Sequence, residues 1–435
     1  MRCLLALFVA STICIARPAA AVELQSIVSA ASRYHSANGR LERMYRAALL
    51  DTSHQATMAA DGTAYVRTGD IPAEWLRDAS AQVRPYLFFA RSDPTVASLL
   101  RAIIAREAKY VQIDPYANAF TLDYRVWEEK FELDSLDYPI MLAWTYWKVT
   151  GDGSLFNGDL SLAFDRALQT MEREQDHTHS SHYTHKELHD GKRGEATPTG
   201  YTGMIWSGFR PSDDACKYHY LIPAEMMTVV ALGELEEIER VIYRNLLKAN
   251  RAETLREEVQ TGIQTYGVIF TPNYGYVYAY EVDGLGNSVI MDDANIPSLL
   301  SAPYLGYTKP DSFIYQNTRK FLLSRDDPYY YVGKVARGIG SAHTNDGYVW
   351  PLAIIMQGLT AGNDGERRDV LGELLASDPG DHLLHESFDP SDPQRYSRKD
   401  FGWPNALFSE YVLTNFNGTP ALPSASTNDL EFRGG

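Results

Sequence analysis

Apolar residues recur at three- and four-residue intervals along most of this chain, and that spacing limits it to a mainly helical fold. The pattern is clearest at 24–50, 93–113 and 220–250. Such spacing puts apolar side chains on one face of an α-helix. We therefore expect an all-α chain of roughly a dozen helices. Shorter segments repeat the pattern at 134–150, 160–175, 252–265, 350–361, 364–376 and 402–414.

One segment departs from the helical pattern. Residues 266–284 hold two runs of aromatic and β-branched residues around Asn273-Tyr274-Gly275, which is typical of a small β-hairpin. No linker rich in Gly, Ser or Pro divides the chain. We interpret the helices and their polar, aromatic-rich loops as one toroid of helical hairpins, whose loops at one end build a single site. Two separate α-helical domains are the alternative.

Residues 1–21 have the pattern of a secretory signal peptide. An apolar run from Cys3 to Ala16 follows Arg2, and Ala19 to Ala21 offer a cleavage site. The run is too short to span a membrane. We expect cleavage after Ala21, a secreted or periplasmic protein, and one domain over 22–435. The mature chain would keep only Cys216, so no intrachain disulfide is expected.

The chain is acidic, with a formal net charge of −16 at pH 7. Losing Arg2 and Arg17 with the signal peptide would make it −18 (−16 − 2). This charge argues against nucleic acid and anionic membranes as partners and favours a neutral or cationic one. The chain also holds 28 Tyr and 7 Trp, whose flat faces and polar tips suit sugar rings. Asn417-Gly418-Thr419 is a sequon that only a eukaryotic secretory pathway would glycosylate.

Two adjacent acids, Asp213 and Asp214, stand among aromatic residues in "WSGFRPSDDACKYHY" (206–220). One interpretation is a helix start, with Ser212 as the N-cap and both acids in the first turn. The other is catalytic. Crowding two carboxylates raises the cost of ionising both and helps one to stay protonated. The local sequence leaves both open.

Other loop segments carry the same residue types, and together they favour one chemistry. The chain has no G-x-S-x-G elbow, Walker loop, H-E-x-x-H or dinucleotide motif. His182, His185 and His189 have helical spacing but lie in a Ser/Thr/Gly-rich region, so we expect no metal and no cofactor. Carboxylates, aromatics, arginines and histidines in loops suit glycoside hydrolysis, which needs a protonated acid and a second carboxylate. These loops span 65–87, 114–139, 206–220, 291–307, 338–352 and 383–411.

These loops resemble glycoside hydrolase family 125 from Tyr65 to Tyr411. The motifs are "TGDIPAEWLRDASAQV", "DPYANAF", "TGMIWSGFRPSDDAC", "DDANIPSLLSAPYLGY", "GSAHTNDGYVWPL" and "HESFDP…FGWPNALFSE". The resemblance implies a single (α/α)6 barrel and a metal-independent, inverting exo-α-1,6-mannosidase that acts on α-mannoside oligosaccharides or N-glycans. Another (α/α)6 enzyme, such as a glucosidase or a lyase, and a non-catalytic glycan-binding protein are the alternatives.

The resemblance also assigns site residues. The general acid falls on Asp214, preferred to Asp213, and the general base on Glu386, with Glu410 as second choice. Three positions depart from the family pattern, namely Glu74, Asp137 and Ala342. We expect the extra acids at 74 and 137 to lie near the site. The residues implied to bind the terminal mannose are Trp75, Arg77, Asp78, Trp206, Arg210, His343 and Trp350.

Overall fold

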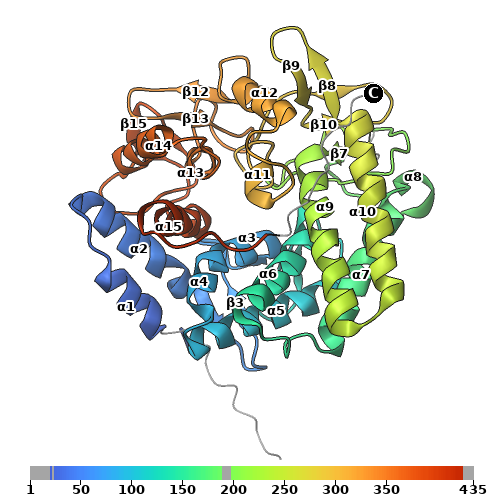
Figure 1. Cartoon of the computed structure of the whole chain (residues 1–435), viewed down its shortest axis with the longest axis horizontal. Coiled ribbons are helices and arrows are strands. Elements are labelled where there is room, and N and C mark those ends of the chain that lie inside the picture. The colour runs from blue at the N-terminus through green and yellow to red at the C-terminus, as the bar shows by residue number, and fades with distance from the viewer. Residues whose placement is uncertain (1–19, 22–23, 189–196, 425–435) are drawn as a thin grey trace, which may run out of the picture.

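The computed structural model describes residues 20–21, 24–188 and 197–424, and most of them are helical (Figure 1). The segment predicted to be a signal peptide lies outside these residues, apart from Ala20–Ala21. Those two residues form strand β1, which pairs with β2 (Ala56–Met58). The signal peptide therefore stays a prediction. No described helix is long and apolar enough to cross a membrane.

Twelve helices of the described chain alternate between an outer and an inner ring. The outer ring holds α2 (Gly39–Gln55), α5 (Pro94–Ile113), α7 (Gly158–Glu174), α10 (Leu246–Tyr266), α12 (Phe313–Leu322) and α14 (Asp364–Ala376). The inner ring holds α3 (Leu76–Val83), α6 (Asp134–Thr150), α9 (Ile222–Glu237), α11 (Ala302–Leu305), α13 (Pro351–Leu359) and α15 (Gly402–Phe416).

Most neighbouring inner helices pack on one another, and the last returns to the first. α3 packs on α6, α6 on α9 and α9 on α11, while α15 packs on both α13 and α3. Each of α2, α10 and α14 covers an inner neighbour, respectively α15, α9 and α13. Figure 1 shows α15 beside α2, which closes the ring. The fold is thus the (α/α)6 barrel that the sequence predicted.

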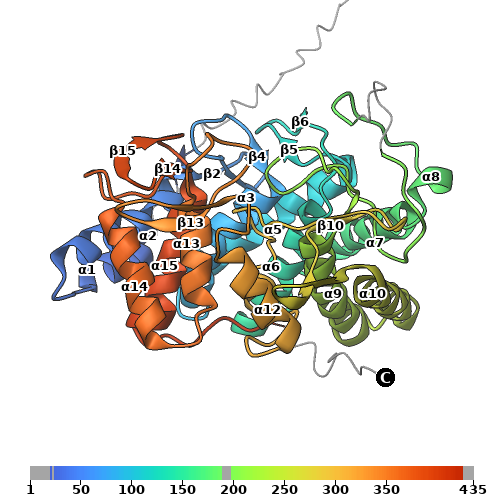
Figure 2. The ribbon, with the colours of Figure 1, turned by 90° about the horizontal axis from the view of Figure 1, so that it is seen from above.

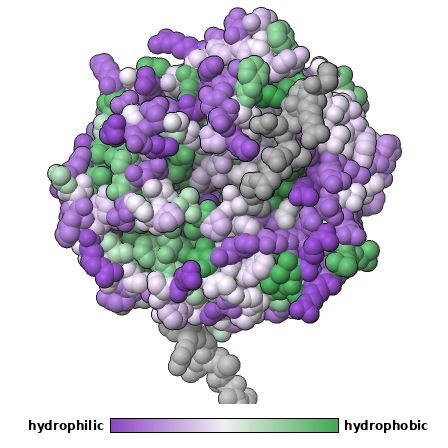
Figure 3. Space-filling view, in the orientation of Figure 1, coloured by the Kyte–Doolittle hydropathy of each residue, from purple (hydrophilic) through white to green (hydrophobic). Residues whose placement is uncertain are grey.

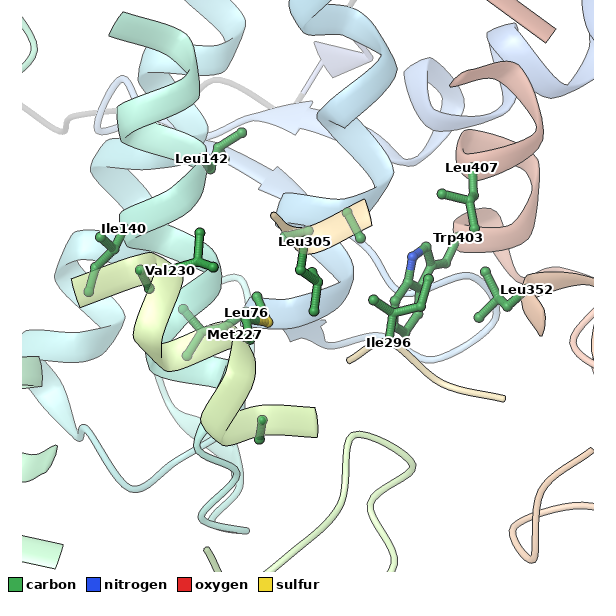
Figure 4. Packing of buried hydrophobic residues seen from close by; sticks show 14 of the residues in the cluster. Leu76, Ile140, Leu142, Met227, Val230, Ile296, Leu305, Leu352, Trp403 and Leu407 are labelled. Atoms are coloured by element: carbon green, nitrogen blue, oxygen red, sulfur yellow. The ribbon is translucent and has the colours of Figure 1, made fainter. Parts of the chain in front are cut away.

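The composition of each helix explains which ring it joins. In α9, residues 222–232 are buried without a break, and in α15 residues 402–413 are. A helix that is apolar on all sides must be covered on all sides. Figure 4 shows the result, with side chains from α3, α6, α9, α11, α13 and α15 meeting in the barrel. Outer helices keep a polar face, and Figure 3 shows polar residues over most of one side of the molecule.

Two of the long predicted helices are each divided by an asparagine cap. Segment 24–50 becomes α1 (Gln25–Arg33) and α2, because the Asn38 side chain accepts hydrogen bonds from the Arg40 and Leu41 amides. Within segment 220–250, α9 ends in a π-helical turn at 238–243, and the next helix, α10, begins after its N-cap residue Asn245. Such side chains satisfy amides that a new helix leaves free. Further short helices are α4 (Leu87–Ala90), α8 (His177–Ser180) and a 3₁₀ turn at Arg84–Tyr86.

The strands are short, antiparallel and mostly gathered at one end of the barrel. Figure 2 shows β2, β4, β5, β6, β14 and β15 along one side of the helices. The predicted hairpin is present as β8 (Val268–Thr271) and β9 (Gly275–Tyr278). The other strands are β3 (Ala64–Val66), β4 (Glu74–Trp75), β5 (Ala119–Phe120), β6 (Val126–Glu128), β7 (Tyr220–Leu221), β10 (Glu281–Val282), β11 (Ser288–Val289), β12 (Tyr330–Val332), β13 (Arg337–Ile339), β14 (Phe388–Asp389) and β15 (Asp392–Tyr396).

Buried carboxyl groups make the stability of this fold depend on pH. Burial raises the pKa of Glu74 and Asp327 to about 7 and that of Asp51 to about 6. Unfolded, these groups titrate near pH 4, so between pH 4 and 7 the native protein binds more protons than the unfolded chain. Stability therefore falls as pH rises through that window.

We expect the thermal unfolding midpoint to be higher at pH 5.5 than at pH 7.5, measured by calorimetry. Asp51→Asn keeps an oxygen for Asn405, whose amide donates to Asp51 over 2.9 Å, but removes a titrating group. Its midpoint should vary less with pH than that of the unmodified protein. A midpoint that is flat or rising from pH 5.5 to 7.5 would contradict this account.

Candidate active site

A cavity of about 440 Å³ lies where the N-terminal ends of three inner helices meet. The residues before α3, α13 and α15, namely Trp75, Trp350 and Phe401, all line it. None of the three caps its helix with a side-chain hydrogen bond. Helix N-termini carry partial positive charge and favour carboxylates nearby. The other lining residues are Thr68, Ile71, Arg77, Asp78, Trp127, Glu128, Lys130, Pro211, Ser212, Asp213, Asn295, His343, Glu386, Arg398 and Trp403.

Asp213 enters this cavity from an irregular loop and not from a helix. The interpretation of Ser212 as a helix N-cap is wrong, because residues 206–219 contain no helix. Asp213 instead has φ +65°, a left-handed conformation that strains a non-glycine residue and is common at functional sites. Its Oδ1 accepts hydrogen bonds from Arg77 Nη2 at 3.3 Å and Asn118 Nδ2 at 3.1 Å.

Asp214, the acid preferred from the sequence, contacts two cavity residues but is not itself part of the cavity lining. Asp214 Oδ2 accepts a hydrogen bond from the Ser212 hydroxyl at 3.2 Å, and Oδ1 lies 3.4 Å from His343 Nδ1. That hydrogen bond raises the pKa of His343. Of the two adjacent acids, Asp213 is the one that a ligand in the cavity would meet.

Arg77 connects four carboxyl groups on one side of the cavity. α3 begins at Leu76, so Arg77 and Asp78 lie in its first turn. The guanidinium lies within 4 Å of Asp78, Glu132, Asp134 and Asp213, at 3.5, 2.5, 3.7 and 3.3 Å. One cation cannot compensate four neighbouring carboxylates, three of which are buried. Burial accordingly raises the pKa of Asp78 and Asp134 to about 6 and that of Glu132 well above its usual range.

Glu386 also lines the cavity and has hydrogen-bond partners of its own. Its Oε2 accepts a hydrogen bond from Ser397 Oγ at 2.9 Å, and its Oε1 accepts one from Arg398 Nη1 at 3.3 Å. Arg398 also donates to Asp70 and to the Thr68 carbonyl. Asp78 interacts electrostatically with both Asp213 and Glu386, so it lies within reach of each.

A glycine permits the loop contact that holds Arg398. Gly69 has φ +56°, and a Cβ there would lie 1.9 Å from the Asp400 carbonyl oxygen. Any side chain would therefore push the 68–70 loop away from the segment that carries Arg398. The Asp70 amide donates to the same Asp400 oxygen at 3.1 Å.

The second acid pair, Asp292 and Asp293, is structural. Asp292 accepts hydrogen bonds from the amides of Leu299 and Leu300, both at 2.9 Å. Asp293 accepts from the Asn295 side chain and from the Ser341 hydroxyl. This pair thus fixes the two loops that bring Asn295 and His343 to the cavity.

Besides Asp214, three predicted site residues lie outside the cavity. Trp206 is fully buried, with its ring stacked between His177 at 3.6 Å and His219 at 4.6 Å, so it cannot contact a sugar. Glu410 lies seven residues beyond Trp403 on α15, about 10 Å farther along the axis. It accepts hydrogen bonds from Arg84 Nε at 3.0 Å and the Tyr304 hydroxyl at 2.9 Å.

The third, Arg210, acts on the Asp213 loop. Its Nε donates to Glu281 Oε1 at 2.6 Å, which fixes the loop to β10. Its carbonyl accepts the Asp213 amide, and its amide donates to the Asp214 carbonyl. Arg210 therefore shapes the turn that presents Asp213 and does not reach the cavity itself.

The two extra acids also lie away from the cavity. Glu74 accepts hydrogen bonds from the Val66 amide, Arg106 and Tyr110. Asp137 accepts one from Thr228 at 2.7 Å, and burial raises its pKa well above the usual value. Strand alternation turns Glu74 to the opposite side from Trp75. The expectation that these acids lie at the site is wrong.

Sequence reasoning missed several residues that shape the cavity. The most important are Asn118 and Glu132, which both contact the Asp213 side chain, and Arg398, which contacts Glu386. Asn118 lies within the motif "DPYANAF". Glu132 lies in a run of acidic residues, a pattern that usually marks a solvated helix face, so the sequence did not single it out. Trp127, Lys130 and Asn295 line the cavity as well.

The described residues offer no group of three or more His, Cys, Asp or Glu side chains that could hold a metal ion. His189, part of the weak histidine pattern, lies outside those residues. The His185 ring lies perpendicular to the Phe209 ring, with 4.9 Å between the ring centroids. The Nδ1 atom of His185 accepts a hydrogen bond from the Glu187 backbone amide at 3.3 Å.

Comparison with known proteins identifies the family. Residues 38–413 match metal-independent α-mannosidases, glycoside hydrolase family 125. The chain is 39% identical to a metal-independent α-mannosidase of Streptococcus pneumoniae, solved as a non-productive complex with α-1,6-mannobiose. That match covers 90% of this chain and 97% of the other, with a TM-score of 0.85.

A curated relative and more distant structures are also similar. Meiotically up-regulated gene 157 protein of Schizosaccharomyces pombe is 38% identical over 395 residues, 82% of this chain and 77% of the yeast protein. A Hormoconis resinae glucoamylase is 12% identical with a TM-score of 0.61 over 92% of this chain and 75% of its own. At that identity the likeness concerns the fold alone.

The Arg84–Glu410 contact predicts a structural role for Glu410. Glu410→Gln leaves the Arg84 guanidinium, whose side chain is 22% exposed, without its counter-charge, which should lower the free energy of unfolding by about 1–3 kcal/mol. Chemical denaturation measures this loss. The matched control, Arg84→Met with Glu410→Leu, removes both charges and should be more stable than the single variant. An unchanged unfolding free energy in Glu410→Gln would return this carboxylate to the functional candidates.

Proposed function

The chain belongs to glycoside hydrolase family 125, the metal-independent α-mannosidases, and we propose that it removes terminal α-1,6-linked mannose from the non-reducing ends of glycans. The observation that carries this proposal is the pair Asp213 and Glu386. Both line one cavity, and each pairs with a different guanidinium. A glycan-binding protein without turnover would need no such pair.

Asp213 is the proposed general acid and Glu386 the proposed general base. Asp213 would give a proton to the glycosidic oxygen as the bond to the anomeric carbon breaks. Glu386 would take a proton from the water that attacks the opposite face of the sugar. The donors Ser397 and Arg398 fix the orientation of Glu386 for this task. Such an inverting reaction needs the two carboxyl groups about 6.5–9.5 Å apart, with room for water.

The cavity walls suit a single mannose ring. Trp75 is buried at the cavity, where its indole offers a flat face to a sugar ring. Asp78, Asn295 and His343 add further polar groups. Trp403 and Arg77 are both almost fully buried and would close the inner end, as exo action requires.

Trp127 is the residue we propose to contact the sugar on the leaving-group side. It lines the cavity, yet its side chain belongs to the exposed aromatic residues, at 49%. An exposed indole at the rim offers a flat face to a second ring. We further propose that the mature protein is exported and meets glycans outside the cytoplasm, supported by the pattern of residues 1–21.

The substrate assignment predicts linkage selectivity without added metal. Among α-1,2-, α-1,3- and α-1,6-mannobiose, we expect the α-1,6 isomer to be hydrolysed fastest, and EDTA to leave that rate unchanged. Chromatography of released mannose measures both. Preference for another linkage would contradict the substrate class. Loss of activity with EDTA, restored by calcium, would contradict metal independence.

The acid assignment predicts unequal effects at two adjacent positions. Asp213→Asn removes the proton donor and should lower kcat on α-1,6-mannobiose by roughly 100-fold or more. The matched control Asp214→Asn changes a carboxylate outside the cavity and should have a much smaller effect. Steady-state kinetics of both variants decide between them. A large loss in Asp214→Asn with near-normal Asp213→Asn would move the acid to Asp214.

A further inference from the structure

Glu132 is a buried carboxyl directly behind Asp213. It is 1% exposed and does not line the cavity. Its Oε2 accepts hydrogen bonds from Arg77 Nη1 at 2.5 Å and from Ser135 Oγ at 3.0 Å. Its Oε1 accepts none from any N–H or O–H group of the described residues. A buried carboxyl oxygen without a donor favours the protonated form, and the Asp213 carboxylate, held by Nη2 of the same guanidinium, is the neighbouring acceptor for that proton.

Two carboxyl groups can share a hydrogen bond only when one of them carries a proton. Burial raises the pKa of Glu132 well above its usual range. Burial also acts to raise the pKa of Asp213, but Arg77, the hydrogen bond from Glu132, Lys130 and His343 together hold it below the usual value. Asp213 Oδ1 accepts hydrogen bonds from Arg77 and Asn118, and its side chain is 22% exposed. Glu132 Oε1 is instead buried without a donor, so the proton of the pair rests on Glu132.

This distribution conflicts with the proposed role of Asp213, because a general acid must be protonated when the leaving oxygen departs. We propose that Glu132 holds the acid proton of the resting enzyme and passes it to Asp213 along their shared hydrogen bond. Asp213 in turn protonates the glycosidic oxygen. Glu132 touches no substrate and is thus a positioning residue for the proton. The inference rests on the proposed function.

The proton count balances over one turnover. One proton leaves Glu132 for Asp213, and one leaves Asp213 for the departing sugar oxygen. Water adds to the anomeric carbon, and Glu386 takes the proton that the water loses. The cycle ends with a proton on Glu386 and one missing from the Glu132–Asp213 pair, and exchange with solvent restores both.

The charged surroundings allow the proton to move at little electrostatic cost. Arg77 contacts both carboxyls, through Nη1 to Glu132 and Nη2 to Asp213. Whichever group is ionised therefore faces the same guanidinium. The other charged or titratable groups around the pair are Asp78 from α3, Asp134 from α6, Lys130, His343, Tyr183 and Cys216.

A purely structural role for Glu132, holding Arg77, makes different predictions from a proton role. Loss of structure would slow all substrates alike. Loss of the proton source would slow only substrates whose leaving oxygen needs protonation. The leaving group of α-1,6-mannobiose is a sugar alkoxide, whose oxygen needs a proton. The leaving group of 2,4-dinitrophenyl α-mannoside is a stable phenolate, which needs none.

The test is kcat/KM against pH for Glu132→Gln on both substrates. We expect roughly a 10- to 100-fold loss on mannobiose at neutral pH, within the range of general acid catalysis. The alkaline limb of that profile should move to lower pH, because an amide in place of Glu132 stabilises ionised Asp213. The dinitrophenyl substrate should keep nearly its full rate. Glu107→Gln is the matched control, since Glu107 is fully buried, bonds to Ser80 and lies outside the cavity.

Each outcome decides one question. Equal losses on both substrates, or an alkaline limb that does not move, would overturn the proton role. If Glu132→Gln fails to fold, Glu132→Asp keeps a titrating group but withdraws it by one methylene. That variant should also lose more activity on mannobiose than on the dinitrophenyl substrate. An equal loss of activity on both substrates would overturn the proposal. An unmodified protein inactive on both substrates would instead refute the proposed function.

Discussion

Arg77 is the cation around which the site is assembled. It is almost fully buried, and its guanidinium pairs with carboxyls from α3, from α6 and its preceding residues, and from the 206–219 loop. A buried charge is tolerated only when it is paired and hydrogen-bonded. The position of α3 against α6 and the shape of the Asp213 loop are therefore coupled. Burial raises the pKa of Asp78, Glu132 and Asp134 around this guanidinium, whereas the pKa of Asp213 is lowered.

The barrel brings the Arg77 cluster near a second charged cluster, formed by Arg398 and Glu386, and the two clusters share no ion pair among the described residues. α3 and α15 are neighbours in the inner ring, and their N-terminal ends open into the same cavity. Arg77 stands at the start of α3, and Arg398 lies just before α15. Each guanidinium orients one carboxylate, Asp213 or Glu386. Two carboxylates with separate counter-ions can have different protonation states, which acid–base hydrolysis needs.

The sequence predicted the barrel well because helical periodicity depends on local spacing. α9 and α15 were evident as apolar segments, and only caps such as Asn38 and Asn245 divided what looked continuous. Asp213, Glu386, Trp75 and Trp350 were found because motifs carried them. The direction of a side chain in a loop depends on partners far along the chain. Sequence therefore could not tell that Arg210 pairs with Glu281, or that His177 and His219 enclose Trp206.

The stereochemistry of the first product tests the central claim most directly, that Asp213 and Glu386 act on one sugar from opposite faces. Proton NMR of an α-mannoside digest, recorded before mutarotation, resolves the two anomers of free mannose. Water activated by Glu386 attacks the face opposite the leaving group, so β-mannose should appear first. Early α-mannose would mean a covalent glycosyl-enzyme and two carboxyls in close approach, which would contradict the roles assigned here.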